Sequence, residues 1–181
     1  DAMALGLRVR EARRAQGLSA WTAPAILDWQ TFLRATWEDR TRFDAVDDRL
    51  LLNSMQERSI WANIAGQEQS LATLPGGPRS RIAALAMQAH RLLCAYAPKY
   101  LREGARAGWQ LDAGIFSGWL TAFEQACRSE RLLSTERLPL ELIARLEEAD
   151  SSPDARQARP PLLLVGFDRI LPVQNRLLDT W

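Results

Sequence analysis

The chain has 181 residues, of which 47% are hydrophobic and 25% are charged, and its formal net charge is +1. This balance is typical of a folded globular protein and excludes an intrinsically disordered chain, which combines low hydrophobicity with high net charge. The longest apolar run, residues 162–167, is far shorter than the ~20 residues that a membrane-spanning helix needs. With no signal peptide expected at the N-terminus, we expect a globular piece of a longer protein and no membrane contact.

The basic residues exclude two common catalytic motifs. Lys99 is the only lysine among 23 basic residues. Its neighbours Pro98 and Tyr100 do not fit a phosphate-binding GxxxxGK[ST] loop, which needs glycine before the lysine and a hydroxyl after it. Ala97 stands where a D…(D/E)xK nuclease site needs an acid. We therefore expect no catalytic site and no cofactor in this chain.

The histidine and the cysteines offer little for metal binding or nucleophilic catalysis. His90 is the only histidine, and Cys94 lies four residues later on the same face of a predicted helix. These two residues could supply two zinc ligands, but nothing nearby supplies the others, so a partly buried helix face is the preferred interpretation. Cys127 is far away and forms no CxxC pattern. Two cysteines without a pairing pattern favour a reducing, cytoplasmic compartment, and no metal site is expected.

Helix and turn signals organise the N-terminal part of the chain. Apolar spacing predicts a helix over residues 3–16, which Gly17 ends. Residues 21–27 predict a short extended segment that reads as β, since Pro24 restricts the residue before it. Asp28 is a suitable N-cap for the next helix, which carries aromatic side chains at spacings of three and four.

The middle of the chain predicts a run of helices. Ser54 and Glu57 form an S-x-x-E capping box at the start of one helix. The sequence LPGGP at residues 74–78 is a strong helix breaker. Further helices are predicted over residues 80–97, 113–131 and 139–149. Residues 150–160 are polar and contain proline, which is typical of an exposed linker.

After this linker the pattern changes to β. Residues 161–167, PLLLVGF, form a short apolar run that predicts a strand buried on both faces of a parallel sheet. Pro172 suits the first turn of a closing helix. The predicted fold class is mainly α with a small parallel β element. Because two strands do not form a sheet of useful size, either further strands lie outside this chain or the two pair beside a helical lobe.

The sequence LLLVGFDRILPVQNRLL at residues 162–178 resembles motif II of superfamily 1 DNA helicases. The matching positions of this degenerate motif are Val165, Gly166, Phe167, Asp168, Pro172 and Gln174. Val165 and Gly166 replace the Asp-Glu pair that holds magnesium and orients water in an ATPase. In this altered form the motif is similar to the N-terminal helicase-like region of AddB-type proteins and of probable DNA repair proteins with a PD-(D/E)XK nuclease. Residues 17–27 and 51–57 also resemble segments of that region.

The resemblance implies a fragment of a P-loop-helicase-like α/β domain. Residues 1–40 would supply a helix, a strand and a helix, residues 41–155 a helical insertion, and residues 156–181 the motif-II-like strand and its helix. The implied function is a non-catalytic helicase-like module of a bacterial DNA repair or recombination nuclease, contributing DNA binding and scaffolding. Its partners would be DNA, through the parent protein, and the remaining domains of that parent or a helicase or nuclease subunit. The alternative is a helical protein-interaction domain with no nucleic-acid role.

The candidate DNA-binding residues lie in the basic stretch 79–109. This stretch contains six basic residues and one acid: Arg79, Arg81, Arg91, Lys99, Arg102 and Arg106 against Glu103. Aromatic residues between them could stack on bases while the cations contact phosphates. The alternative is that these arginines decorate solvated helix faces and that the aromatic residues pack inside.

Overall fold

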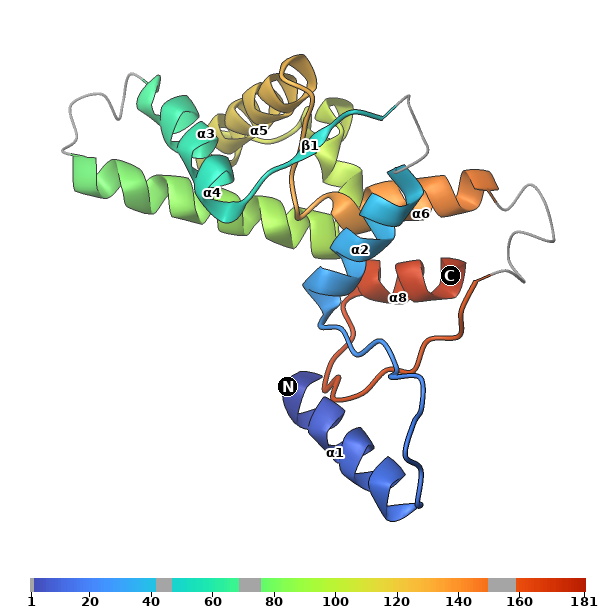
Figure 1. The fold of residues 1–181 in the computed structure, drawn as a ribbon. Coiled ribbons are helices and arrows are strands. Elements are labelled where there is room, and N and C mark those ends of the chain that lie inside the picture. The colour runs from blue at the N-terminus through green and yellow to red at the C-terminus, as the bar shows by residue number, and fades with distance from the viewer. Residues whose placement is uncertain (1, 42–46, 69–75, 150–158) are drawn as a thin grey trace. The chain divides into compact units, whose positions relative to one another are not determined.

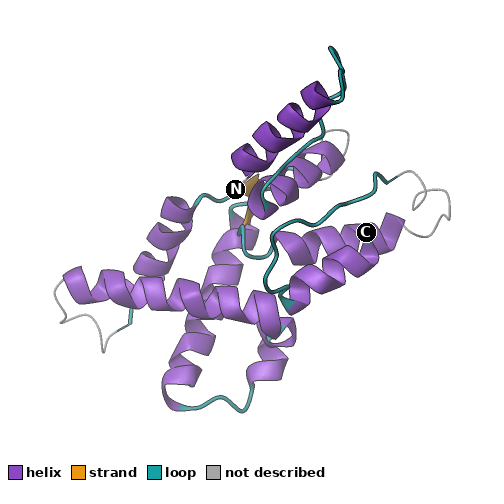
Figure 2. Cartoon of the chain, turned by 90° about the horizontal axis from the view of Figure 1, so that it is seen from below, coloured by secondary structure: helices purple, strands orange, loops and turns teal. Residues whose placement is uncertain are grey.

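The computed structural model describes residues 2–41, 47–68, 76–149 and 159–181. The chain divides into two compact units, Asp1–Val46 and Asp47–Trp181. Helices make up most of the described residues, and the only strands among these residues are two short ones (Figure 2). The expectation of a mainly α chain with a small parallel β element is therefore confirmed. The expected helicase-like domain boundaries stay a prediction.

The first unit contains two helices, α1 (Ala2–Ala15) and α2 (Trp29–Thr41). Gly17 follows α1 with a φ of +78°, a left-handed conformation that favours glycine after a helix. Asp28 caps α2 as predicted, because its Oδ1 accepts a hydrogen bond from the backbone N–H of Thr31 at 3.0 Å.

The extended segment predicted over residues 21–27 is not a strand, and this expectation is wrong. Within the described part of this unit there is no second strand with which it could pair. Pro24 also lacks the N–H that a ladder would use. The segment is therefore a loop between the two helices.

The second unit holds the remaining elements (Figure 1). In chain order these are β1 (Leu50–Leu51), α3 (Ser54–Gly66), α4 (Gly76–Tyr96), the 3-10 helices η2 (Pro98–Leu101) and η3 (Glu103–Arg106), α5 (Leu111–Ser129), β2 (Leu132–Leu133), α6 (Leu138–Ala149) and α8 (Pro172–Thr180). Helices α5 and α6 lie within two residues of the ranges that the apolar spacing predicts. Helix α4 begins at Gly76, four residues before the predicted start, so residues 76–78 of the expected helix breaker belong to the helix. Residues 150–158 of the expected linker lie outside the described residues.

Helix α3 begins differently from the prediction. Asn53, not Ser54, is the N-cap: its side chain accepts from the backbone N–H groups of Met55 and Gln56, and Gln56 accepts in return from Asn53 N–H. This reciprocal pair is a capping box one residue earlier than expected. Glu57 is thereby placed on the buried face of the helix.

The parallel β element exists, but from other residues than predicted. β1 and β2 pair in parallel, with Leu50 opposite Leu132 and Leu51 opposite Leu133. The strand expected at residues 161–167 is wrong: these residues form a loop with mostly exposed side chains, Leu163 being 89% exposed. A strand buried on both faces needs neighbours on both edges, and the described residues offer it none.

The core of this unit lies where α3, α4 and α5 meet. The Trp61 ring of α3 stacks on Phe123 of α5, with ring centroids 4.3 Å apart and an interplanar angle of 11°. His90 of α4 meets the same Phe123 ring edge-on at 5.2 Å. All three side chains are fully buried. Burial of large aromatic side chains of this kind is the main driving force for packing the three helices together.

Helices α6 and α8 pack side by side and extend this core (Figure 1). Val173 and Leu177 are the buried face of α8. The end of α8 is held by Arg159, whose Nη1 donates to the carbonyl oxygens of Thr180 and Trp181. The start of the connection from Pro160 to α8 is thus held against the end of α8.

Candidate functional site

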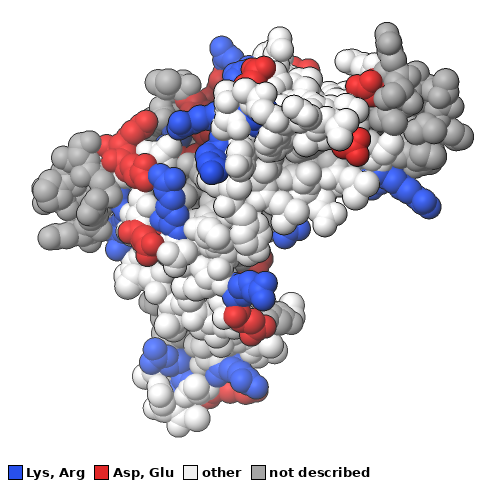
Figure 3. Space-filling model, turned by 180° about the vertical axis from the view of Figure 1, so that it is seen from behind, with Lys and Arg blue, Asp and Glu red and all other residues white. Residues whose placement is uncertain are grey.

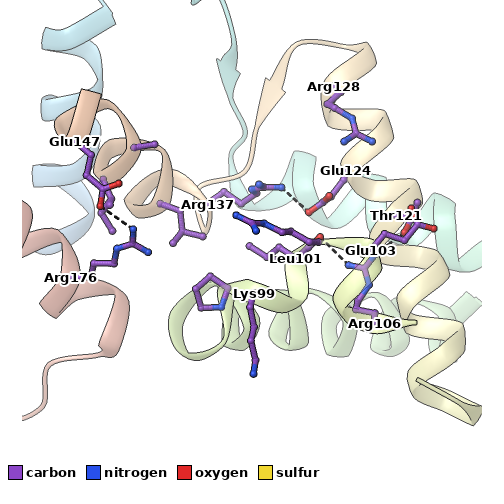
Figure 4. Close-up of a pocket in the computed structure, with 15 residues that line it drawn as sticks. Lys99, Leu101, Glu103, Arg106, Thr121, Glu124, Arg128, Arg137, Glu147 and Arg176 are labelled. Carbon is purple, nitrogen blue, oxygen red and sulfur yellow. Dashed lines mark hydrogen bonds and ion pairs between the residues drawn. The ribbon is translucent and has the colours of Figure 1, made fainter. Parts of the chain in front are cut away.

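A cleft of about 610 Å³ opens in the second unit between α5, α6, α8 and the turn segment 98–106 (Figure 4). Six cations and three carboxylates line it: Lys99, Arg102, Arg106, Arg128, Arg137 and Arg176, with Glu103, Glu124 and Glu147. The lining therefore carries a clear excess of positive charge. Such an excess in a concave surface favours an anionic ligand.

Two ion pairs neutralise part of this charge and hold the walls together. Arg137 Nη1 donates to Glu124 Oε1 at 2.7 Å, which joins the loop before α6 to α5. Arg176 Nη2 donates to Glu147 Oε1 at 2.9 Å, which joins α8 to α6. In Figure 4 the Arg176–Glu147 pair lies at the left and the Arg137–Glu124 pair near the centre. The walls are thus linked by their own charged side chains.

Arg106 has a structural role in the cleft floor. Its side chain is only 3% exposed. Nε donates to Ser117 Oγ at 2.9 Å and Nη2 to Thr121 Oγ1 at 2.7 Å, while Nη1 donates to the carbonyl oxygens of Tyr100 and Leu101. The first two hydrogen bonds fasten η3 to α5, and the other two fasten it to η2. Since its donors are used internally, Arg106 supports the cleft and is not assigned to ligand contact.

Three cations remain available to a ligand. Arg102 and Arg128 are exposed on the cleft wall, and neither forms an ion pair with any residue that the structure describes. Lys99 is exposed too, and its Nζ lies 4.9 Å from the centre of the Tyr100 ring. Figure 4 shows the Lys99 side chain directed away from the paired arginines. Guanidinium groups in such positions can bind phosphate oxygens through two parallel hydrogen bonds.

The structure brings together three of the six candidate DNA-binding residues. Lys99, Arg102 and Arg106 line the cleft. Arg81 and Arg91 are exposed on α4 outside the lining, and Arg91 Nε lies 3.9 Å from Glu136 Oε2. The side chain of Arg79, the remaining candidate, lies outside the described residues. Figure 3 shows the molecule from behind, and basic and acidic side chains are interspersed on that face.

Three of the cationic residues that line the cleft were not predicted from the sequence. Arg128, Arg137 and Arg176 come from α5, the loop before α6, and α8. Arg137 lies in residues 134–154, whose net charge is negative. The local net charge therefore did not indicate a cationic site there. No spacing along the chain relates these positions to Lys99, and only the packing of α5, α6 and α8 brings them together.

A second polar cluster lies inside the core. Glu57, His90 and Ser134 are all buried, and the Ser134 hydroxyl lies 3.1 Å from both Glu57 carboxylate oxygens. His90 Nδ1 is 3.4 Å from Glu57 Oε1, and His90 Nε2 is 3.5 Å from Cys94 Sγ. This cluster is enclosed by packed side chains, which indicates a role in the fold.

Neither cysteine is suited to nucleophilic chemistry. Burial raises the pKa of the Cys94 thiol far above its usual range, and burial raises the pKa of Cys127 to about 12. Both sulfurs are therefore neutral thiols near pH 7, and both cysteines are free. The described residues contain no group of three or more His, Cys, Asp or Glu side chains placed to hold a metal ion.

Four of the six motif-II-like residues, Val165 to Asp168, lie on the connector before α8, which we define as residues 161–171, and Pro172 and Gln174 lie in α8. Val165, Gly166 and Asp168 are exposed there, and Gly166 has a φ of +76°. Pro172 occupies the first turn of α8, and Gln174 Oε1 accepts from the N–H of Leu171 at 2.9 Å. The Pro-x-Gln pattern therefore has a local explanation, because it starts and caps a helix.

Comparison with protein-family models, with curated proteins and with solved structures gives no match to this chain. None of the helices in the described residues is long and apolar enough to cross a bilayer.

Proposed function

We propose that this chain is a non-catalytic DNA-binding and scaffolding module, and that its cleft contacts the phosphate backbone. The supporting observation is the lining of six cations and three carboxylates, in which Arg102 and Arg128 are exposed and have no ion-pair partner among the described residues. Most of the affinity of proteins for DNA without sequence preference comes from such cation–phosphate contacts. The paired arginines and Arg106 link the elements that form the cleft.

The resemblance of residues 162–178 to motif II suggests the wider context. In that context the parent protein is a bacterial DNA repair or recombination nuclease of the cytoplasm, and this chain belongs to its inactive helicase-like region. Val165 and Gly166 stand at the positions of the magnesium-binding acids, and neither side chain can ligate a cation. The module would therefore hold DNA without hydrolysing ATP. The remaining parent domains or a helicase or nuclease subunit would be its partners.

The experiment is a fluorescence anisotropy titration of labelled DNA across a salt series. We expect binding at ~50 mM salt whose log K falls linearly with log salt, with a slope of roughly −0.7 to −0.9 for each phosphate contacted. The double variant R102E/R128E should weaken binding by roughly tenfold or more and flatten this slope, because two phosphate contacts become repulsive.

The matched control is R81E/R91E, which makes the same charge change on α4, outside the cleft lining. We expect this control to change the affinity several times less than the cleft variant. Equal losses for the two variants would show that overall charge, not the cleft, attracts DNA. No binding by the unmodified chain at ~50 mM salt would overturn the proposal.

The connector favours a second candidate, docking of a protein partner. Its apolar side chains are mostly exposed, with Leu163 at 89% and Val165 at 53%. A run of exposed apolar residues is more typical of an interaction surface than of free solvent contact. Absence of DNA binding, together with lost partner capture in L163D, would favour this protein-interaction function over the first candidate.

A further inference from the structure

Tyr100 and Trp109 form an aromatic pair beside the cationic cleft. Their ring centroids are 5.4 Å apart and the rings are tilted by 44°. Both side chains are half-buried, so each keeps part of its surface in solvent. Lys99 joins the pair to the cleft, because it lines the cleft while its Nζ lies 4.9 Å from the Tyr100 ring centre.

Arg106 fixes the backbone of both aromatic residues. Its Nη1 donates to the Tyr100 carbonyl oxygen at 3.0 Å, and its own carbonyl oxygen accepts from Trp109 N–H at 2.9 Å. A side chain on Gly114 would approach the Trp109 carbonyl oxygen to 3.3 Å, so the absence of one lets α5 lie close to this turn. The two rings are thus carried by a backbone that is already ordered before any ligand binds, which lowers the entropic cost of binding.

We propose that the Tyr100–Trp109 pair stacks on unpaired bases and makes single-stranded DNA the preferred ligand of the cleft. The inference rests on the proposed function, since the cleft cations must hold the phosphates. Unpaired bases expose their faces to aromatic side chains, whereas bases inside a duplex are stacked on one another. A stacking surface next to a phosphate-binding surface therefore selects the single strand. Stacking on any base is possible, so no sequence preference is expected.

The test compares a single-stranded oligonucleotide with a hairpin duplex of the same length, both labelled, by anisotropy on the complete chain. We expect tighter binding of the single strand. The variants Y100L and W109L should each weaken single-strand binding by roughly fivefold or more, the loss expected for one stacked base. They should leave the salt slope unchanged, because the phosphate contacts remain.

The variants Y100F and W109F serve as matched controls, since they keep an aromatic face and should retain the single-strand preference. Leucine variants that bind like the unmodified chain, with a normal salt slope, would overturn the stacking proposal and leave the phosphate-binding cleft intact. Equal affinity for single strand and duplex would do the same. A chain that binds neither DNA would overturn both proposals.

A crosslinking measurement on the unmodified protein tests the proposal even if the leucine variants do not fold. Single-stranded DNA containing bromouracil is crosslinked to the chain by ultraviolet light, and the crosslinked residues are identified by mass spectrometry. We expect crosslinks at Tyr100 or Trp109. Crosslinks confined to other aromatic residues would overturn the proposal.

Discussion

Glu57 carries a carboxylate into the centre of the helical core, where water cannot solvate it. Ser134 compensates with a hydroxyl 3.1 Å from both carboxylate oxygens, and the His90 ring lies beside them. A buried polar group is tolerated only where such partners are present, and removing one of them is costly. The same cluster joins α3 to the turn that follows β2 and to α4.

Ser134→Ala should therefore destabilise the protein. A hydrogen bond to Glu57 is lost while its carboxyl group stays buried, so we expect the free energy of unfolding to fall by about 1–3 kcal/mol. Urea denaturation followed by circular dichroism measures this change. The control is Ser59→Ala on the exposed face of α3, for which we expect less than ~0.5 kcal/mol. Equal stabilities of the two variants would show that Ser134 does not support the buried carboxylate.

Glu57 also shows that residue types alone do not determine where a helix cap forms. The pattern Ser54-x-x-Glu57 fits a capping box, yet the equivalent box one residue earlier, Asn53-x-x-Gln56, forms instead. Both pairs offer suitable side chains, and local geometry does not distinguish them. Packing in the core selects between them, because the Ser134 hydroxyl reaches the Glu57 carboxyl oxygens only when Glu57 lies on the inner face.

At the scale of elements, Asp47 ties the residues before β1 to α6. It accepts from Arg49 Nε at 3.0 Å and from Arg145 of α6, while Arg49 also reaches Glu141 of α6 at 2.9 Å. The hydrogen bonds from Arg49 and the charges of both arginines lower the pKa of Asp47 from 3.8 to about 2. Protonation of this carboxyl group would remove the charge that both arginines bind.

Asp47→Asn should make the protein less stable near neutral pH and should change its response to acid. The folded-state pKa is below the unfolded value, so the carboxylate stabilises the fold above pH 3.8, and this contribution is lost as the pH falls towards 2. We expect the urea midpoints of wild type and D47N to differ by a constant amount above about pH 5 and to converge below pH 3.8.

The control for this series is Asp168→Asn on the exposed connector, whose midpoint should follow the wild type at every pH. A difference between wild type and D47N that persists unchanged down to pH 2 would contradict the assignment, because the effect would then not depend on ionisation of Asp47.

At the scale of the whole molecule, the second unit contains a complete core. The cluster around Trp61, Leu120 and Phe123 draws all its members from residues 52–140, and α6 with α8 covers a further apolar surface. We therefore expect residues 47–181 to fold without residues 1–46. The expected result is a single cooperative urea transition by circular dichroism and tryptophan fluorescence. A broad, non-cooperative transition would show that the second unit depends on the first.

Much of the secondary structure was determined by the sequence alone, because its causes act within one or two helical turns. Apolar spacing predicts α4, α5 and α6, Asp28 marks the start of α2, and Pro172 marks the start of α8. A helix hydrogen-bonds to itself, so its signals lie within its own residues.

The strands and the cleft were decided only by the tertiary structure. A strand needs a partner strand from elsewhere in the chain, and the apolar run at 161–167 has none among the described residues. The Leu-Leu pairs at 50–51 and 132–133 do form strands, because they meet when α3 and α5 pack. The cleft likewise joins Lys99 and Arg102 to Arg128 and Arg176 only through the packing of α5, α6 and α8. Charge along a sequence is local, whereas the field that a ligand meets is the sum over all groups that folding places around it.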